Sequence, residues 1–346
     1  MTRARIKEVA ELAGVSPSTV SVVLNDVPGA RVKTATRERV QAAARELGYL
    51  PNGLARGLRT RRSGILALIS DVIATTPYAG QLIQGAQEAA WEAGYLLMLV
   101  DTGGDSELER SAIRALRQQQ VAGVLYATMY HRHVEVPELL TGLPVVLLDA
   151  RPARGYVPAV VPDEEAGART AVAALADHGH RRIGFVLDRN DGPAVTGRLA
   201  GYRAELDARG LPRDDTLVVR ATSSSAGGRE AVAALLDLPQ PPTAVFAFND
   251  EMAVGAYHAA EDRGLRIPRD LSVVGFDDLY VVAREMRPGL TTVALPHRAM
   301  GAVAARSLLR LVSDPAAAVP PLQLVDCPLV RRGSVAEAPT AVPAQA

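Results

Sequence analysis

The first fifty residues show apolar positions at helical spacing, interrupted by one short turn. One helix would bury Ile6, Val9, Ala10 and Ala13, and a second would bury Val20, Val23 and Leu24. Between them Gly14 allows a tight turn, because glycine adopts positive φ without a steric clash. Ser16 suits the N-cap of the second helix and Pro17 its first position. The pattern predicts a helix-turn-helix, although an ordinary helical hairpin would show the same spacing.

A third amphipathic helix is predicted over residues 35–47, directly after Thr34. Its inner face would hold Val40, Ala43, Ala44 and Leu47. Pro51 then opens a linker, residues 51–63, which could place three apolar residues along one side of a short helix: Leu54, Ala55 and Leu58. Two glycines and four arginines in this linker oppose helix formation, through backbone entropy and charge repulsion. The linker helix is therefore expected to be weak in isolation, and a disordered tether is the alternative.

From Gly64 onward, strand-like apolar runs alternate with helical stretches. A first series of strands is predicted at residues 65–70, 95–100, 123–127 and 145–148. A second series begins near Ala159, with strands at residues 183–187, 217–220, 244–248 and 272–276. Such alternation is typical of parallel sheets covered by helices on both faces. The sequence thus predicts an α/β body with two doubly wound parallel-sheet subdomains and a cleft at the carboxyl ends of their strands.

Charge is divided unevenly along the chain. Residues 1–62 contain twelve Lys or Arg and five Asp or Glu, which gives this segment a net charge of +7. The whole chain has 38 residues of each sign, so residues 63–346 carry −7. A basic segment on an acidic body is the distribution expected of a module that binds nucleic-acid phosphates. Because the basic segment coincides with the helix-turn-helix, DNA binding is favoured over a merely solvated charged face.

Several motifs follow one another in a fixed order. The N-terminal ones are VAxxAGVSxxTVSxVLN at residues 9–25, TRERVxxAxxELGYxPN at 36–52 and ARxLR at 55–59. Those of the body are HGHRRIGFV at 178–186, RLAGY at 198–202, PTAVFAFNDEMAVGA at 242–256, GLRIPRDLSVVGFDD at 264–278 and LTTV at 290–293. With these motifs the chain resembles the LacI (lactose-repressor) family of bacterial transcription regulators over residues 6–334. The resemblance implies an all-α helix-turn-helix head and a body like that of periplasmic sugar-binding proteins.

The resemblance also implies where the chain divides. The DNA-binding head would span residues 1–50, the hinge linker 51–63, and the effector-binding and dimerisation body 64–334. Three crossings would assign residues 64–162 and 291–323 to the first subdomain, and 163–290 and 324–334 to the second. Residues 335–346 are rich in Pro and Ala and are predicted to be disordered. Two bodies would form a homodimer that places two heads on a pseudo-palindromic operator in double-stranded DNA.

In the head, the resemblance assigns DNA contacts to the second helix and the linker. Base edges would be read from Pro17, Ser18 and Val22, and phosphates would be held by Ser16, Thr19, Ser21 and Asn25. Leu58 would wedge into the minor groove, with Ala55 packing nearby. Many relatives carry arginine or histidine where Val22 stands, and a valine could touch only a thymine methyl. The half-site sequence is therefore left open.

In the body, the resemblance implies a small-molecule effector in the cleft. Positions that bind sugar hydroxyls in sugar-responsive relatives are occupied by Arg198, Asn249 and Asp277, and Asp149 follows a strand at the other lip. An arginine, an amide and two carboxylates can satisfy neighbouring hydroxyls from both sides. Tyr78 would line the pocket, and His297 falls where relatives place a stacking aromatic, although a surface histidine is the simpler interpretation. Arg198 and Asp277 could also simply pair with each other across the cleft.

Two departures from the family pattern bear on the effector. Gly192 stands where purine-responsive relatives have arginine, which favours a sugar, a sugar phosphate or a polyol over a purine. The common Val-Asp-Asn sequence after one strand is replaced by Val-Pro-Asp-Glu at residues 161–164.

Other functional classes find little support in the sequence. Phosphate-loop, HExxH, GxSxG and strand-linked GxGxxG motifs are missing, so an enzyme, a cofactor and a metal site are not expected. The histidine pairs 131/133 and 178/180 are predicted to be loop and surface residues, and Cys327 a small buried one. The N-terminus lacks a signal sequence, which favours a cytoplasmic protein over a solute-binding transport component. The prediction is a non-enzymatic, effector-controlled repressor; a cytoplasmic sugar-binding or sugar-metabolising protein without DNA control is the alternative.

Overall fold

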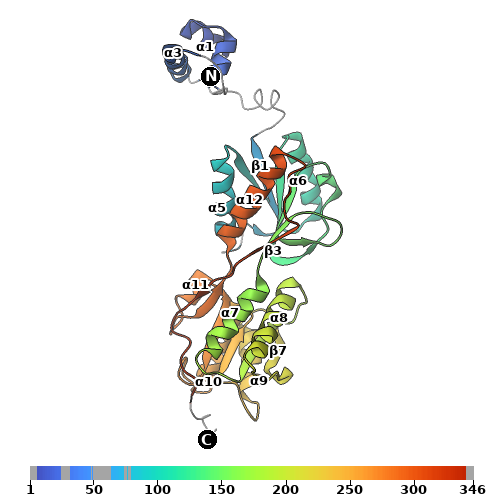
Figure 1. Cartoon of the computed structure of the whole chain (residues 1–346), viewed down its shortest axis with the longest axis vertical. Coiled ribbons are helices and arrows are strands. Elements are labelled where there is room, and N and C mark those ends of the chain that lie inside the picture. The colour runs from blue at the N-terminus through green and yellow to red at the C-terminus, as the bar shows by residue number, and fades with distance from the viewer. Residues whose placement is uncertain are drawn as a thin grey trace. The chain divides into compact units, whose positions relative to one another are not determined.

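A computed structural model describes residues 6–24, 32–47, 49, 64–73, 76 and 79–339 of the chain. These residues belong to two compact units. The head unit consists of Met1–Gly64 with Gln119–Val121, and the body unit of Ile65–Gln118 with Ala122–Ala346. Figure 1 shows the helices and strands of both units.

Three helices of the head unit surround a small apolar core. They are α1 (Ile6–Ala13), α2 (Pro17–Leu24) and α3 (Thr34–Glu46). Their buried residues are Val9, Ala10, Ala13, Val20, Val23, Val40, Ala43 and Ala44, as the apolar spacing predicts. Gly14 has a φ of 64° in the turn between α1 and α2. Two details differ from the prediction: Thr34 is the first residue of α3 rather than the one before it, and Leu47 is exposed.

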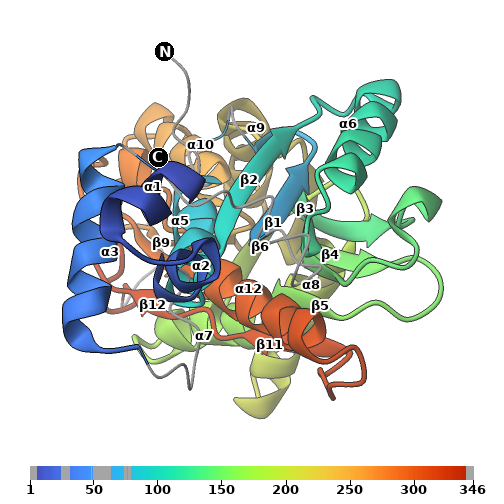
Figure 2. The ribbon, with the colours of Figure 1, turned by 90° about the horizontal axis from the view of Figure 1, so that it is seen from above.

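The first sheet of the body unit has six parallel strands. Their order is β11 (Leu322–Val325), β5 (Ala159–Pro162), β4 (Val145–Pro152), β3 (Gly123–Val134), β1 (Ile65–Ser70) and β2 (Leu96–Asp101), as can be followed in Figure 2. Accompanying helices are α5 (Ala79–Glu92), α6 (Ser106–Gln118), the short η2 (Glu138–Leu140) and α12 (His297–Ser313). We call this sheet and its helices the first lobe.

The second sheet of the body unit also has six strands. Their order is β12 (Leu329–Val330), β10 (Thr291–Ala294), β9 (Ser272–Asp277), β8 (Ala244–Ala247), β6 (Ile183–Asp188) and β7 (Val218–Ala221). All neighbours are parallel except β10 and β12. The helices of this second lobe are α7 (Glu164–Ala176), α8 (Pro193–Ala208), η3 (Asp215–Leu217), α9 (Ser225–Leu236), α10 (Asp250–Asp262) and α11 (Tyr280–Ala283).

The chain crosses between the two lobes three times. It leaves the first sheet after β5, returns after β10 to form α12 and β11, and crosses back to form β12. β10 therefore belongs to the second sheet, where it pairs with β9, whereas the boundary predicted at residue 291 placed it in the first. The reason is backbone pairing, since a strand of four residues carries no pattern that says which sheet it joins.

Disorder is predicted from residue 335 onward, but the residues just after it are bonded to the second lobe. The N–H of Ala336 donates to Ser272 Oγ at 3.1 Å, and the Ala336 carbonyl accepts a hydrogen bond from His180 Nε2 at 3.1 Å. The N–H of Ala338 donates to the His178 carbonyl at 2.8 Å. These bonds hold residues 336–338 against the second lobe, and His180 beneath them is buried rather than a surface residue. Residues 340–346 lie outside the described part of the chain.

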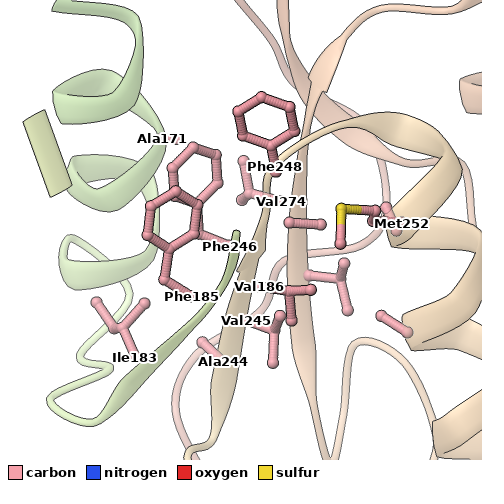
Figure 3. Close-up of a cluster of buried hydrophobic side chains, with 14 of the residues drawn as sticks. Ala171, Ile183, Phe185, Val186, Ala244, Val245, Phe246, Phe248, Met252 and Val274 are labelled. Atoms are coloured by element: carbon pink, nitrogen blue, oxygen red, sulfur yellow. The ribbon is translucent and has the colours of Figure 1, made fainter. Parts of the chain in front are cut away.

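The second sheet has an aromatic centre (Figure 3). Phe185 of β6 and Phe246 of β8 stack with their ring centroids 4.5 Å apart and an interplanar angle of 9°. Phe276 of β9 continues the row, with its centroid 6.4 Å from that of Phe246. On its other side, the Phe276 ring contacts the guanidinium of Arg198, whose Cζ lies 3.7 Å from the ring centroid. The core of this lobe thus reaches the carboxyl end of the sheet.

Strand β3 runs seven residues beyond its predicted end at Ala127. Its pairing with β4 shifts register between Ala127 and Arg132, after which Arg132 lies opposite Ala150. This extension carries His131, whose side chain is buried, whereas a surface position was predicted. The polar sequence of the extension hides it from pattern analysis, because only its pairing with β4 makes it a strand.

Helices α5 and α12 approach each other closely at two glycines. A Cβ on Gly85 of α5 would overlap the carbonyl oxygen of Arg298, and a Cβ on Gly301 of α12 would overlap that of Leu82. Both obstacles are backbone atoms, so a rotamer change cannot relieve the overlap. This contact seats α12, and with it His297 at its first position, on the first lobe.

We expect Gly85→Ala to lower the free energy of unfolding of the body by at least about 2 kcal/mol, because an added methyl would force the two helix backbones apart. Gly80→Ala in the same helix is the matched control. Nothing lies within 4 Å of a Cβ there, so its effect should be within about 1 kcal/mol of zero and stabilising in sign. Urea unfolding followed by circular dichroism measures both, and equal effects of the two changes would contradict the packing argument.

Candidate functional site

Helix α2 presents a polar first turn to solvent. Ser16, Pro17 and Ser18 are exposed, and Thr19, Ser21 and Val22 are half-buried. Ser16 Oγ accepts a hydrogen bond from the N–H of Thr19 at 3.2 Å, so Ser16 caps the helix as predicted. Hydroxyls that surround an exposed helix N-terminus suit an anion such as a phosphate. The other predicted DNA-binding residues, Asn25, Ala55 and Leu58, lie outside the described residues.

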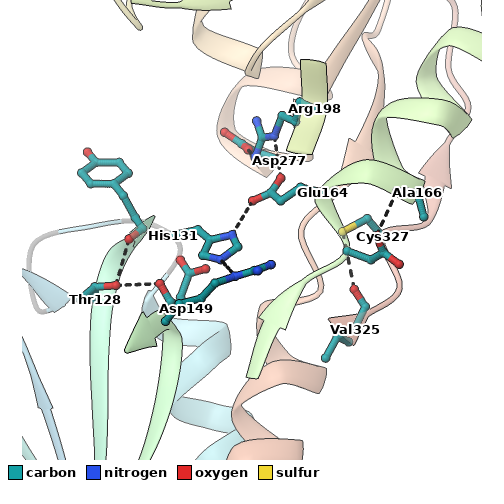
Figure 4. A network of polar contacts seen from close by, with 12 residues as sticks. Thr128, His131, Asp149, Glu164, Ala166, Arg198, Asp277, Val325 and Cys327 are labelled. Atoms are coloured by element: carbon teal, nitrogen blue, oxygen red, sulfur yellow. Dashed lines mark hydrogen bonds and ion pairs between the residues drawn. The ribbon is translucent and has the colours of Figure 1, made fainter. Parts of the chain in front are cut away.

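The second candidate site lies at the carboxyl ends of the strands of the body, where Arg198 of α8 is its centre (Figure 4). Arg198 Nε donates to Glu164 Oε2 at 2.7 Å, and Nη1 donates to the carbonyl of Phe248. Nη2 lies 3.7 Å from Asp277 Oδ1, a longer ion pair. The guanidinium also lies over the rings of Phe276 and Phe248. Arg198 is 4% exposed, so its charge is compensated almost entirely by protein groups.

Two helices position the Arg198–Glu164 pair. Glu164 is the first residue of α7, and Arg198 lies one turn into α8. A Cβ on Gly197 would lie 2.7 Å from the Cβ of Glu164, and one on Gly201 would overlap the Glu165 carbonyl. These glycines therefore let the start of α7 approach α8 closely enough for the two charged groups to meet.

Histidine 131 connects this pair to the first lobe. Its Nδ1 lies 3.3 Å from Glu164 Oε1, and its Nε2 accepts a hydrogen bond from Arg151 Nε at 3.0 Å. A neutral imidazole with its proton on Nδ1 satisfies both contacts. Figure 4 shows the resulting chain of contacts, which crosses from β3 and β4 of the first lobe to α7, α8 and β9 of the second.

The pKa values of the three carboxyl groups of the site are shifted in different directions. Burial alone raises the pKa of Glu164, but the charge of Arg198 and the hydrogen bonds from His131 and Arg198 outweigh it, so the pKa falls below its usual value. Burial raises the pKa of Asp277 well above its usual value in spite of Arg198. Burial and the negative charge of Glu164 do the same for Asp149. Glu164 is therefore the carboxylate that neutralises Arg198.

Asp149 and Asp277, the two aspartates whose pKa is raised, also have unusual backbone conformations. Asp149 within β4 has a φ of 55°, and Asp277 at the end of β9 has a φ of 115°. Residues other than glycine rarely adopt such φ angles, and those that do are often found at functional sites. Asp149 is held by its carbonyl, which accepts from Thr128 Oγ1 at 2.7 Å. Among described partners, no hydrogen bond reaches its carboxylate, which leaves that group available to a ligand.

The other predicted effector residues lie at the edge of this cluster or outside it. Asn249 uses its side chain within the second lobe: Oδ1 accepts from the N–H of Met252 at 2.8 Å and Nδ2 donates to Ser223 Oγ at 2.7 Å. His297 is 7% exposed rather than a surface residue, and burial lowers its pKa to about 4. Tyr78 lies outside the described residues.

A polar cavity of about 180 Å³ adjoins the cluster at the carboxyl ends of β1, β2 and β3. Its lining includes Ser70, Asp71, Thr102, Tyr126, Thr128 and Arg132. Thr128 also bonds to the Asp149 backbone, so the cavity and the cluster share a residue. The cavity is smaller than the roughly 300 Å³ typical of small-molecule sites. A ligand of sugar size would therefore need the cluster residues as well.

The structure brings together Arg198, Asp149 and Asp277, which the sequence singled out, with Glu164 and His131, which it did not. The alternative that Arg198 pairs with Asp277 is partly confirmed, because the two lie 3.7 Å apart, although the shorter bond of Arg198, at 2.7 Å, goes to Glu164. The signal for Glu164 was the replacement of Asn in the motif at residues 161–164. His131 gave no signal, because its burial follows from the irregular pairing of β3. Neither Arg198 nor Asp277 is open to water, since their side chains are 4% and 11% exposed.

Asp250 supports the turn that carries Asp277. It is fully buried, and its carboxylate accepts from the N–H of Leu279 at 2.7 Å and from Thr292 Oγ1 at 2.6 Å. These bonds join the start of α10 to the turn after β9 and to β10, the strand from which the chain returns to the first lobe. Burial raises the pKa of Asp250 to about 7.

A helix-turn-helix unit joined to a two-lobed body with a polar cluster between its sheets defines a DNA-binding regulator with a periplasmic-binding-protein-like body. Residues 5–52 match the family of bacterial regulatory proteins of the lacI type, and residues 172–335 match a periplasmic binding protein-like domain. The ribose operon repressor of Escherichia coli K12 is 34% identical over 333 residues, which cover 96% of this chain and 99% of the repressor. The chain belongs to the LacI family.

Solved structures agree with this assignment over nearly the whole chain. A complex of the transcriptional regulator CelR with cellobiose is 32% identical, covers 96% of this chain and all of that one, and has a TM-score of 0.67. The lac repressor dimer bound to operator and the anti-inducer ONPF is 28% identical, with a TM-score of 0.78 over 97% of this chain and all of that one.

Among the described residues, no helix is both long and apolar enough to cross a membrane. Nor do three or more His, Cys, Asp or Glu side chains in the described ranges come together as a metal site. Cys327 is buried, as predicted.

The raised pKa of Asp250 predicts a specific pH dependence of stability. The folded state keeps the Asp250 proton up to about pH 7, whereas the unfolded chain releases it near pH 3.8. This contribution to stability is complete below pH 3.8 and is lost as the pH rises through 7, at up to about 1.4 kcal/mol per pH unit. We expect Asp250→Asn to remove that loss between pH 5 and 8, as measured by urea unfolding at each pH.

The control for Asp250→Asn is Asp262→Asn, in the same helix. The hydrogen bond from Arg229 lowers the pKa of Asp262, so this group titrates below the tested range. Its replacement should leave the pH dependence between 5 and 8 unchanged. If the wild type and Asp250→Asn have parallel profiles, Asp250 is ionised in the folded protein throughout that range.

Proposed function

We propose that this protein is a sequence-specific transcription repressor whose operator affinity is controlled by a small, sugar-like effector. In this proposal residues 1–50 bind DNA, residues 51–63 form the hinge, and residues 64–334 bind the effector and form a homodimer. The observation that carries it is the joining of a helix-turn-helix to a two-lobed body whose polar cluster takes groups from both lobes. As a regulator of bacterial genes, the protein would act in the cytoplasm.

The DNA-binding part of the proposal rests on the surface of α2. Its first turn is exposed, uncharged and rich in hydroxyls, and the segment that contains it has a net charge of +7. Ser16, Thr19 and Ser21, with Asn25, would contact phosphates, while Pro17, Ser18 and Val22 would face base edges. Leu58 of the hinge would wedge into the minor groove, with Ala55 packing nearby. The lac repressor dimer, a relative of known structure, is bound to operator.

The effector part of the proposal rests on the cluster around Arg198. Asp149, Arg198 and Asp277 would bind ligand hydroxyls, with Asn249, His297 and Tyr78 at the edge of the site. Because the contact between His131 and Glu164 spans the two lobes, a ligand that separates or tightens them would change the angle between the lobes. Such a ligand shifts the equilibrium only by its difference in affinity for the two states. Cellobiose is the ligand in the complex of the relative CelR.

The homodimer rests on an exposed apolar edge of the first lobe. β2 is the last strand of its sheet, and Leu96, Met98 and Leu99 on it are 57%, 36% and 41% exposed. Trp91, at the end of the helix that packs on β2, is 69% exposed. An exposed apolar edge strand promotes aggregation unless another surface covers it. A second copy of the chain, related by a two-fold axis, would do so.

The alternative, a sugar-binding or sugar-metabolising protein without DNA control, is less well supported. It gives no role to the basic helix-turn-helix, and an enzyme would need a nucleophile or an acid–base pair beside a substrate. In the cluster, Glu164 is already engaged by Arg198 and His131. The proposal is accordingly a regulator rather than an enzyme.

The DNA-binding face can be tested with one added charge. Selection from a random duplex library with the wild type should yield a pseudo-palindromic site. We expect Ser18→Asp to weaken binding to that site at least roughly hundredfold, because a carboxylate would face the DNA. It should not harm folding, since an acidic residue in the first helical turn is favourable by about 0.3–1 kcal/mol. Fluorescence anisotropy measures the association constant. The logarithm of that constant should fall linearly with the logarithm of the salt concentration, with a slope of about −0.9 per neutralised phosphate.

Gln41→Glu is the control for Ser18→Asp. It also adds one negative charge to the head, but at an exposed position in the middle of α3. Its effect on affinity should be several times smaller than that of Ser18→Asp. If the two variants lose affinity equally, total charge rather than the face of α2 governs binding. A wild type that selects no site from the library would contradict the proposed function itself.

The dimer face can be tested by Leu96→Lys. In a two-fold interface each change acts twice, and a buried leucine contributes about 1.5–3 kcal/mol. We therefore expect the dimer dissociation constant to rise at least roughly hundredfold, as measured by sedimentation velocity over a concentration series. Leu324→Lys, on the opposite edge strand β11, where Leu324 is 50% exposed, should leave the dimer intact. A reversed result would place the interface on β11.

A further inference from the structure

The arginine that relatives would offer to a ligand is already occupied in this chain. Each nitrogen of the Arg198 guanidinium has one protein partner: Nε donates to Glu164, Nη1 donates to the Phe248 carbonyl, and Nη2 lies 3.7 Å from Asp277. Two aromatic rings also lie close to the guanidinium, with the ring centroids of Phe276 and Phe248 at 3.7 Å and 4.4 Å from its Cζ. An anionic ligand could reach Arg198 only by displacing Glu164.

Displacing Glu164 would itself be costly. Its second oxygen is held by His131, and its side chain is 4% exposed. A carboxylate that loses its partner inside a protein costs several kcal/mol, which a ligand phosphate or carboxylate would have to offset. The incoming anion would also meet two further carboxyl groups, those of Asp149 and Asp277.

The charges of the whole cluster also argue against an anionic ligand at Arg198. Its cations are Arg198 and Arg151, and its carboxyl groups are Asp149, Glu164 and Asp277. His131 accepts a hydrogen bond from Arg151 and is neutral in that geometry. With Asp149 and Asp277 ionised the cluster carries one net negative charge. With both protonated, as their raised pKa values favour, Glu164 still neutralises Arg198 and only the charge of Arg151 is left over. In the adjoining cavity, Arg132 is paired with Asp71 at 2.8 Å.

We propose that Glu164 restricts the effector of this protein to uncharged polyhydroxy compounds and excludes phosphorylated or acidic ones. This inference rests on the proposed function, because it concerns the same effector site. Asp149 and Asp277 would bind hydroxyls as acceptors or, when protonated, as donors. Glu164 would act through Arg198: by neutralising it, Glu164 leaves an arginine that can still donate hydrogen bonds to ligand hydroxyls but has no unpaired charge to offer an anion. The sequence alone allows a sugar phosphate as the effector, and the neutralisation of Arg198 by Glu164 excludes it.

The role of Glu164 can be tested with inorganic phosphate as the probe. In Asp277→Asn, Glu164 still neutralises Arg198, so phosphate should bind no better than it does to the wild type. In Asp277→Asn combined with Glu164→Gln, Arg198 has no carboxylate partner left. We expect phosphate to bind the double variant roughly ten- to hundredfold more tightly, the range of one or two charge-assisted hydrogen bonds. Calorimetric titration at constant ionic strength measures this, and thermal shift shows whether phosphate restores stability.

The matched control is Asp277→Asn combined with Glu205→Gln. Glu205 also pairs with an arginine of α8, Arg209 at 2.7 Å, but at the far end of that helix. Its replacement should give no gain in phosphate binding. An equal gain in the control, or none in the Glu164 variant when it is folded, would overturn the role of Glu164.

A second measurement uses the wild type and does not depend on variant folding. Matched pairs of probes, such as ribose with ribose 5-phosphate and cellobiose with glucose 6-phosphate, are compared by thermal shift. The proposal requires that no phosphorylated member stabilises the protein more than its uncharged counterpart, and a preference for a sugar phosphate overturns it. These results are independent of operator binding, so a protein that selects no DNA site refutes the proposed function while the phosphate titration still decides the role of Glu164.

Discussion

The buried ion pair between Arg198 and Glu164 is the interaction on which the body of this protein depends. Removing a guanidinium from water costs several kcal/mol unless a partner charge and hydrogen bonds replace the lost hydration. Glu164 supplies that charge, and the Phe248 carbonyl and Asp277 complete the surroundings. The pair also fixes geometry, because it requires the start of α7 to lie against α8, which the glycines at 197 and 201 permit.

From this pair the structure extends in two directions. Toward the first lobe, His131 and Arg151 continue the hydrogen-bonded chain, so polar groups connect the two lobes here. Toward the second lobe, the aromatic row of Phe276, Phe246 and Phe185 anchors the strand ends that carry the site. A polar contact between lobes, backed by rigid cores within each, is suited to a protein whose lobes change their relative angle when a ligand binds.

Function in the LacI family requires signals to pass from such a site to DNA, and the chain separates these tasks by charge and polarity. The positive charge is concentrated in the first 62 residues, while the body has a net negative charge and a near-neutral site between its lobes. Exposed apolar residues lie on the edge strand β2 of the body, the face that we propose for a second copy. Asp250 links the effector side to the return of the chain, since it joins the turn after Asp277 to β10.

The sequence by itself determined the helix-turn-helix, the two doubly wound sheets and the family, because periodic apolar spacing and local motifs carry this information. The family resemblance also singled out Arg198, Asp149 and Asp277, which the structure brings together. Only the tertiary structure decided which carboxylate neutralises Arg198, that His131 is buried, and that β10 joins the second sheet. Glu164 and Arg198 are 34 residues apart, and His131 and Glu164 are 33 apart. Contacts between such distant residues depend on strand pairing and helix packing, and neither follows a repeat that can be read along the chain.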